Sequence, residues 1–232
     1  PIALTLRQAE SSLAAASVTI STVTDTAVEL TLGLNWKISG AATRTLAFQI
    51  PTALAEVYDF QVPGLRRLQK STEGDVTTVT INLQQPASES LFVLGLGTLP
   101  LPESREILPQ QPEFIVPADS SDRVSSQSHF WVIVNQSPGL LQPVDAATDG
   151  DQVQPDEIRT NMPEELLEQA VAIRRLKSSQ PLSPWQLSFP ERQQVAPAIV
   201  ALAAHTTVIA EDGSWRSRHR LQIRNESRQF LP

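Results

Sequence analysis

The sequence lacks cysteine altogether, and its 232 residues include only 9 glycines and a single methionine, Met162. Without cysteine, disulfide frameworks and thiolate metal sites are excluded. No apolar run reaches the roughly 18 residues that a membrane-spanning helix needs, and the first residues do not resemble a signal peptide. Because the chain opens on Pro1 instead of methionine, we expect it to be part of a larger protein.

Basic residues are also few. The chain has 18 Lys and Arg against 25 Asp and Glu, which gives a formal net charge of −7. The acidic excess is concentrated in residues 103–190, which carry 13 acidic and 6 basic side chains. Nucleic-acid phosphates require a basic footprint, so the charge of the whole chain argues against a nucleic-acid partner. Apolar residues make up 41 %, which is sufficient for a packed core and argues against disorder.

The clearest positive pattern is the alternation of apolar and polar residues over positions 28–38. A period of two is typical of a half-buried β-strand, because successive side chains point to opposite faces of a sheet. Trp36 falls on the apolar side, so we expect it in the core. Residues 70–75 read as a polar loop. Further strands are expected at 13–24, 46–50, 57–62, 79–83 and 91–96, which is the content of one antiparallel β-sandwich.

The chain changes character after residue 99. Five prolines punctuate residues 100–117, and a Ser-rich polar run follows. We interpret residues 103–128 as a Pro/Ser-rich linker between a β-sandwich domain at 1–102 and a second β-rich domain at 129–232. The expected fold is therefore mainly β, with two antiparallel β-sandwich-like domains and at most one short helix. The helix is expected at 161–169, because Asn161 can cap it and Glu164 follows three residues on. Residues 170–176 could continue this helix or form a strand, and the strand is favoured.

The last segment predicts a long hairpin. Asp212-Gly213 is a turn signal between two alternating runs. Residues 207–232 either close the second domain or open another copy of the first, since a long amphipathic strand, a turn and a short strand ending in proline also occur between Trp36 and Pro51. The sequence leaves both interpretations open.

A family-level resemblance rests on two stretches. Residues 44–51 read Arg-x-Leu-x-Phe-x-Ile-Pro, and Gly74-Asp75-Val76 leads into the strand at 79–83. This arrangement, within residues 13–96, resembles β-sandwich modules of large bacterial cell-envelope proteins of unassigned function. It is also similar to the non-catalytic β-domain at the front of zinc aminopeptidases, although the His-Glu-x-x-His zinc motif is absent. The resemblance implies an immunoglobulin-like binding module located outside the cytoplasm, in the periplasm or at the cell surface.

No catalytic motif stands out. The three histidines, His129, His205 and His219, are far apart in sequence, which favours structural roles. No nucleophile elbow or phosphate-binding loop is present. An acidic loop could supply oxygen ligands to Ca²⁺, although its spacing does not match an EF-hand, and a solvated loop is favoured. The acidic residues concerned are Asp145, Asp149, Asp151, Asp156 and Glu157.

An arginine stripe on the last long strand is the candidate ligand site. Alternating guanidinium groups could hold a carboxylate, a sulfate or an acidic polymer, whereas the simpler interpretation is a solvated strand face that deters edge pairing. The candidates are Arg216, Arg218, Arg220 and Arg224. The four tryptophans, Trp36, Trp131, Trp185 and Trp215, could instead form a sugar-stacking platform, but Trp36 and Trp215 lie on the apolar sides of their strands and are expected in the core.

The sequence thus predicts a non-catalytic binding or spacer module, excised from a larger bacterial extracytoplasmic protein. The expected partners are other domains of the parent protein and, beyond them, protein or polysaccharide. No cofactor or metal is expected. The alternative is a carbohydrate-binding module, which requires exposed aromatic side chains in a strip. A hydrolase or hydrolase accessory domain is a third class, without a supporting motif.

Overall fold

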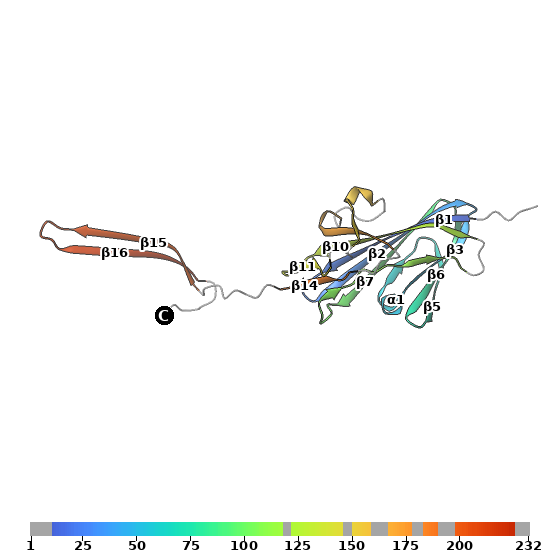
Figure 1. Ribbon diagram of the computed structural model, residues 1–232, viewed down its shortest axis with the longest axis horizontal. Helices are drawn as coiled ribbons and strands as arrows, with labels where there is room; N and C mark the ends of the chain where they lie inside the picture. Colours follow the sequence, from blue (N-terminus) through green and yellow to red (C-terminus); the bar gives the residue numbers. More distant parts are fainter. Residues whose placement is uncertain are drawn as a thin grey trace, which may run out of the picture. The chain divides into compact units, whose positions relative to one another are not determined.

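The computed structural model describes residues 11–117, 122–145, 150–158, 167–177, 183–189 and 198–225, and these are mainly β (Figure 1). The chain divides into two compact units, Pro1–Phe189 and Pro190–Pro232, which are described separately below. Among the described residues, no helix is long and apolar enough to cross a membrane.

A seven-stranded sheet forms the body of the first unit, in the order β12-β13-β10-β1-β2-β7-β4. Strand β1 lies in its middle, pairing with β2 in antiparallel and with β10 in parallel orientation. Every other described strand pair is antiparallel, which agrees with the expected class of fold. The strands are β1 (Ser11–Val23), β2 (Ala27–Gly40), β4 (Asp59–Gln61), β7 (Ser90–Pro100), β10 (Arg123–Asn135), β12 (Asp151–Gln152) and β13 (Ala170–Leu176).

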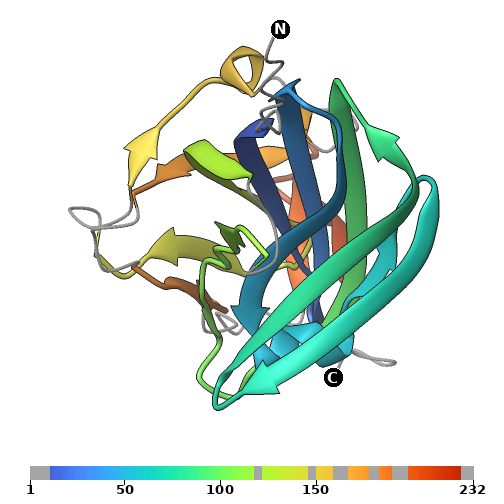
Figure 2. The ribbon, with the colours of Figure 1, turned by 90° about the vertical axis from the view of Figure 1, so that its right-hand side faces the viewer.

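Two smaller sheets complete the unit. One has the order β5-β6-β3-β9 and the other the order β11-β14-β8. Figure 2 shows the long teal to green ribbons of the β5–β6 hairpin beside the blue strands of the large sheet. Their strands are β3 (Thr43–Pro51), β5 (Leu65–Glu73), β6 (Val76–Ala87), β9 (Glu113–Ile115), β8 (Glu106–Ile107), β11 (Leu140–Pro143) and β14 (Trp185–Ser188).

The main core packs between the large sheet and the two smaller ones. The apolar side of β2 enters this core as its alternation predicts, and Trp36 is fully buried there. Phe48 from β3 and Phe114 from β9 pack against the Trp36 indole, with ring centroids 6.2 and 5.1 Å away. Strand β1 is buried on both faces from Ser17 to Val23, so its sequence is rich in β-branched residues and alternates less clearly.

A second apolar cluster covers the opposite face of the large sheet. Val18 and Ile20 of β1 and Val132 of β10 contribute to it from the sheet. Ile158, just after the 3-10 helix η2 (Pro155–Glu157), and Leu167 cover them. The helix expected at 161–169 lies mostly outside the described residues; Leu167 and Glu168 are helical.

Several local predictions need correction. The expected polar loop at 70–75 is instead the end of β5 and a tight turn, in which Gly74 has φ of +61°. The strand expected at 57–62 is present but shorter: β4 covers Asp59–Gln61 with Phe60 buried, whereas Val57 ends helix α1 (Thr52–Val57). Helix α1 has 6 residues, no side-chain cap and no acidic first turn, so the sequence carried little signal for it. The strand expected at 170–176 is confirmed as β13.

The boundary expected at 103–128 is not where the structure divides the chain. Residues 123–135 form β10, which is inserted between β1 and β13 in the same sheet. A parallel pair needs a crossover connection, and the proline-rich run supplies it by leading the chain from β7 back to the start of β10. Residues 129–189 therefore belong to the first unit together with residues 1–102.

The second unit contains one long hairpin of β15 (Ala198–Ile209) and β16 (Trp215–Asn225). Gly213 has φ of +83° in its turn, as the Asp-Gly signal predicted. Trp215 was expected in the core, but its side chain is 69 % exposed, because no described strand covers this face of the hairpin. Residues 226–232, on which the repeat interpretation depends, lie outside the described residues.

Candidate functional site

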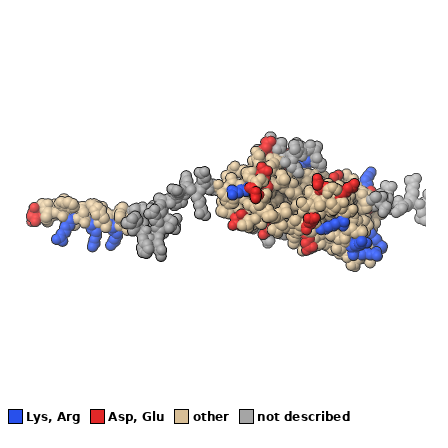
Figure 3. All heavy atoms as spheres, turned by 90° about the horizontal axis from the view of Figure 1, so that it is seen from below, with Lys and Arg blue, Asp and Glu red and all other residues tan. Residues whose placement is uncertain are grey.

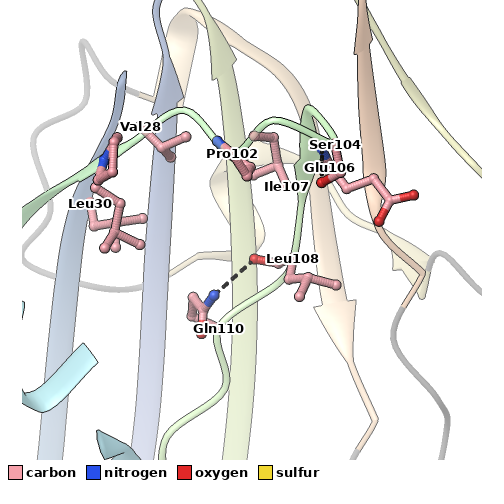
Figure 4. A pocket seen from close by; sticks show the side chains of 10 residues that line it. Val28, Leu30, Pro102, Ser104, Glu106, Ile107, Leu108 and Gln110 are labelled. Atoms are coloured by element: carbon pink, nitrogen blue, oxygen red, sulfur yellow. Dashed lines mark hydrogen bonds between the residues drawn. The ribbon is translucent and has the colours of Figure 1, made fainter. Parts of the chain in front are cut away.

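An apolar pocket of about 380 Å³ opens at the end of the large sheet where β2 begins and β7 ends (Figure 4). Val28 and Leu30 of β2 form one wall, and Ile107 and Leu108 form another. Ser104, Glu106 and Gln110 supply the polar groups at its border. The volume lies at the lower end of the range typical of ligand pockets. The full lining is Val28, Leu30, Leu99, Pro100, Pro102, Ser104, Glu106, Ile107, Leu108 and Gln110.

The proline-rich run builds the outer wall of this pocket. A tight turn at residues 102–105 reverses the chain, and the amide of Arg105 donates to the carbonyl of Pro102 at 2.8 Å. Arg105 adopts a left-handed conformation with φ of 56°, which is uncommon for a residue other than glycine. Its carbonyl accepts from the amide of Leu187 in β14 at 2.9 Å, so the turn is fixed to a neighbouring strand.

Further contacts hold the rest of the wall in place. The hydroxyl of Thr19 in β1 donates to the carbonyl of Gln110 at 2.9 Å, and the amide side chain of Gln110 donates to the carbonyl of Leu108 at 3.2 Å. The Leu108 side chain is 56 % exposed at the pocket border. The wall is thus fixed through its backbone, while its apolar side chains face the cavity and the solvent. Such a pocket is suited to binding apolar groups.

The pocket has no arrangement suited to catalysis. Glu106 is its one ionisable lining residue, so an acid–base pair is lacking. Within the described residues, no group of three or more His, Cys, Asp or Glu side chains could hold a metal ion. The pocket lining is therefore apolar, with a few polar groups at its border.

A serine–histidine pair occurs elsewhere in the same unit. Ser17 of β1 and His129 of β10 are paired, with 2.8 Å between Oγ and Nδ1, although they are 112 residues apart in sequence. Burial lowers the pKa of His129 to about 4, so its imidazole is neutral at pH 7. His129 borders a small pocket with Gln111, Pro112 and Glu113, but Ser17 does not line it and is 1 % exposed. A substrate could not reach the hydroxyl, so the pair serves to join the two strands.

The arginine candidates lie on one face of the hairpin. Arg216, Arg218 and Arg220 alternate along β16 and are exposed, and basic side chains project from one side of the hairpin in Figure 3. None of these three forms an ion pair with a described residue. Arg224 belongs to the same strand, but its side chain lies outside the part that the structure describes.

Three of the four tryptophans are buried. Trp36, Trp131 and Trp185 are exposed by 3 % or less, and Trp131 packs edge-on against Trp185. Trp215 is therefore the one exposed tryptophan. A sugar-stacking strip needs at least two exposed aromatic rings on one face, so the tryptophan platform on which the carbohydrate-binding alternative depended is absent.

The acidic loop offers no calcium site among the described residues. Asp151 pairs with Lys177 at 2.8 Å and Glu157 with Arg175 at 3.3 Å, so both carboxylates already have cationic partners. Asp149 lies outside the described residues. The sequence favoured a solvated acidic loop, and the structure adds these two ion pairs at exposed side chains.

Comparison with known proteins assigns the chain to no family. No protein-family model and no curated protein matches the chain. Among solved structures, it is similar to a non-cellulosomal cohesin from the hyperthermophilic archaeon Archaeoglobus fulgidus, at 12 % identity and a TM-score of 0.29, over 55 % of this chain and 93 % of that chain. A likeness at this level carries no functional argument.

Proposed function

We propose that the protein is a non-catalytic binding module whose β2–β7 end pocket receives apolar side chains of a partner protein. The observation that carries the proposal is the pocket of about 380 Å³, whose wall is fixed by backbone hydrogen bonds and whose lining is mostly apolar. Exposed apolar surface in a defined hollow is typical of interaction sites.

The shape favours a polypeptide over a free small molecule. Leu108 at the pocket border is 56 % exposed, so a small apolar ligand bound beside it would keep part of its surface in water. One or two apolar side chains of a partner would fill it while the partner's own surface covers the opening. Residues 1–189 carry 21 acidic and 12 basic side chains, and Glu106 borders the pocket. We therefore expect the partner segment to combine an apolar anchor with basic neighbours.

The test uses two leucines of equal exposure on different surfaces. Leu108 borders the pocket and is 56 % exposed, whereas Leu140 on β11 is 54 % exposed and does not line it. Peptides selected from a display library against the full chain should lose affinity at least about tenfold for Leu108→Glu, the usual effect of spoiling a contact at an interface centre. They should bind Leu140→Glu as they bind the parent.

Two results would contradict the pocket. The first is unchanged affinity of the selected peptides for Leu108→Glu. The second is an NMR titration in which the protein signals that shift belong to residues away from Val28, Leu30 and Ile107. A control addresses the non-catalytic part of the proposal: the purified chain should hydrolyse no generic ester, peptide, phosphate or glycoside substrate above background.

The parent protein and its location remain part of the proposal. The family resemblance supports a module of a larger bacterial protein outside the cytoplasm, in which neighbouring domains are the first partners. The full-length gene product and its fractionation between cytoplasm, periplasm and cell surface would test this directly.

A second binding face is proposed on the hairpin. Residues 190–232 carry 6 basic and 4 acidic side chains, opposite in sign to residues 1–189, and three guanidinium groups share one exposed face. Arg216, Arg218, Arg220 and Arg224 are proposed to hold carboxylate or sulfate groups of an acidic partner. Binding of heparin as a polyanionic probe should weaken with salt and with Arg218→Gln, whereas an unchanged affinity would remove this candidate.

A further inference from the structure

The face of the hairpin opposite the arginines carries a histidine pair. His205 of β15 and His219 of β16 are directly opposite each other in the strand register. Residues alternate between faces along each strand, so the neighbouring Arg218 and Arg220 lie on the other side. Although 14 residues separate them in sequence, the two imidazole rings lie with centroids 4.2 Å apart and their Nδ1 atoms 3.0 Å apart.

A hydroxyl pair orients one of these rings. Nε2 of His205 lies 2.8 Å from the Thr207 hydroxyl, which lies 2.8 Å from the hydroxyl of Ser217. When Nε2–H of His205 donates to Thr207, the lone pair of His205 Nδ1 is directed toward His219. Metal-ligating histidines are typically held in this way, with the second ring nitrogen donating to an oxygen that fixes the tautomer and the ring orientation.

We propose that His205 and His219 form a two-histidine site for a divalent transition metal ion of the Zn²⁺, Ni²⁺ and Cu²⁺ class. Zinc–nitrogen bonds of about 2.0–2.1 Å in a tetrahedral arrangement separate two ligating nitrogens by about 3.3 Å. The Nδ1 atoms lie about 0.3 Å closer than that separation, and the two rings turn on binding so that both Nδ1 lone pairs point at the cation. The cation replaces the proton shared between the two Nδ1 atoms, and His219 then carries its proton on Nε2.

The surroundings decide the class of cation and the open positions. Imidazole suits Zn²⁺, Ni²⁺ and Cu²⁺, whereas Mg²⁺ and Ca²⁺ prefer oxygen ligands. Among the described residues, no third His, Cys, Asp or Glu joins the pair, so water fills the remaining coordination positions. A site of this kind is open to solvent and leaves the cation accessible to a further ligand.

The experiment titrates the full chain with Zn²⁺ by calorimetry at neutral pH, in parallel with NMR of the imidazole nitrogens. We expect one Zn²⁺ per chain, with signals of His205 and His219 shifted and those of the buried His129 unchanged. The two histidines should bind Cu²⁺ more tightly than Ni²⁺. Binding that shifts neither histidine would overturn the proposal.

Three variants test whether Zn²⁺ binds to both histidines together or to any single exposed histidine. His205→Ala should weaken binding about 100-fold, because the second ligand acts at a high effective concentration. A double change, His205→Thr with Thr206→His, keeps the composition but moves one ring to the arginine face, and it should weaken binding as much. Thr207→Val should weaken it about tenfold by removing the oxygen partner of His205.

The outcomes are distinct. If the rearranged double variant binds Zn²⁺ as tightly as the parent, the cross-strand pair is not the site and the proposal fails. If Thr207→Val binds as tightly as the parent, the orienting role of its hydroxyl fails while the pair stands. Circular dichroism of each variant establishes that the hairpin is intact, and the parent without Zn²⁺ provides the reference.

Discussion

Two buried tryptophans differ in whether the indole N–H has a hydrogen-bond partner, and substitution by phenylalanine tests this difference. Trp36 and Trp131 are both exposed by 1 % or less and both pack against aromatic rings. The indole N–H of Trp131 donates to the Ser21 hydroxyl at 3.0 Å, whereas Nε1 of Trp36 has no hydrogen-bond partner among the described atoms. Phenylalanine removes the N–H from both sites and leaves a comparable gap.

The hydrogen bonding of the two indoles determines which of the two Phe variants is less stable. Trp36→Phe costs about 1 kcal/mol for the cavity left by the smaller ring. It also removes a buried donor that already costs the parent about 1–3 kcal/mol, so its net effect is close to zero or stabilising. Trp131→Phe has the same cavity cost, loses a hydrogen bond worth about 1 kcal/mol and leaves the buried Ser21 hydroxyl without its donor. We expect Trp131→Phe to be at least about 2 kcal/mol more destabilising than Trp36→Phe.

Urea denaturation followed by far-ultraviolet circular dichroism measures both variants without relying on the tryptophan signal. Equal slopes with different midpoints would report stability alone. Trp36→Ala provides the scale, since truncating this buried ring should cost about 3–5 kcal/mol. Equal stabilities of the two Phe variants, or a less stable Trp36→Phe, would refute the assignment of the unpaired N–H.

The remaining predictions concern pH, fragments and fluorescence. Burial lowers the pKa of His129 to about 4 from 6.5, so between these pH values the unfolded chain binds a proton that the folded chain does not. The contribution to the free energy of unfolding, about 3 kcal/mol, is complete above pH 6.5 and is lost as the pH falls toward 4. Urea midpoints of the parent against His129→Gln should converge at low pH, and a pH-independent difference would contradict this origin. A fragment of residues 11–189 should fold, whereas residues 1–102 should not, since β1 would lose β10; circular dichroism distinguishes them. Iodide should quench only a minority of the tryptophan emission, and Trp215→Phe should abolish that fraction, while broad quenching would show that the other three are exposed.

Local alternation predicted most strands, because it reports the one property that a strand encodes in its own residues. The face of β2 that carries Trp36 followed directly from the sequence, and the strand at 170–176 was identified from short-range pattern alone. Alternation does not say whether anything covers the apolar face. Trp215 lies on the apolar side of β16 as expected, yet it is exposed, because no described strand outside the hairpin packs on this side chain.

The pocket and the histidine pair depend on contacts between residues that are distant in sequence, and local alternation does not report such contacts. The pocket forms where the proline-rich run returns to β2, and the same prolines were interpreted as a linker. Alternating apolar residues among those prolines, such as Leu99, Leu101 and Ile107, were the available hint that the run packs against the sheet. His205 and His219 became a pair only through the register of the hairpin, which the Asp-Gly turn could have suggested.

The parallel pairing of β1 with β10 has a consequence for how this chain folds. Strand β10, which pairs with β1, follows it by more than a hundred residues in the sequence. During synthesis, one edge of β1 therefore stays unpaired until residue 135 has left the ribosome. Such long-range pairing makes folding slow, and a waiting strand edge invites association between nascent chains. The small side chains of Ala14, Ala15 and Ala16 limit the apolar surface in the first half of β1, whereas Val18 and Ile20 in its second half are uncovered until β10 pairs.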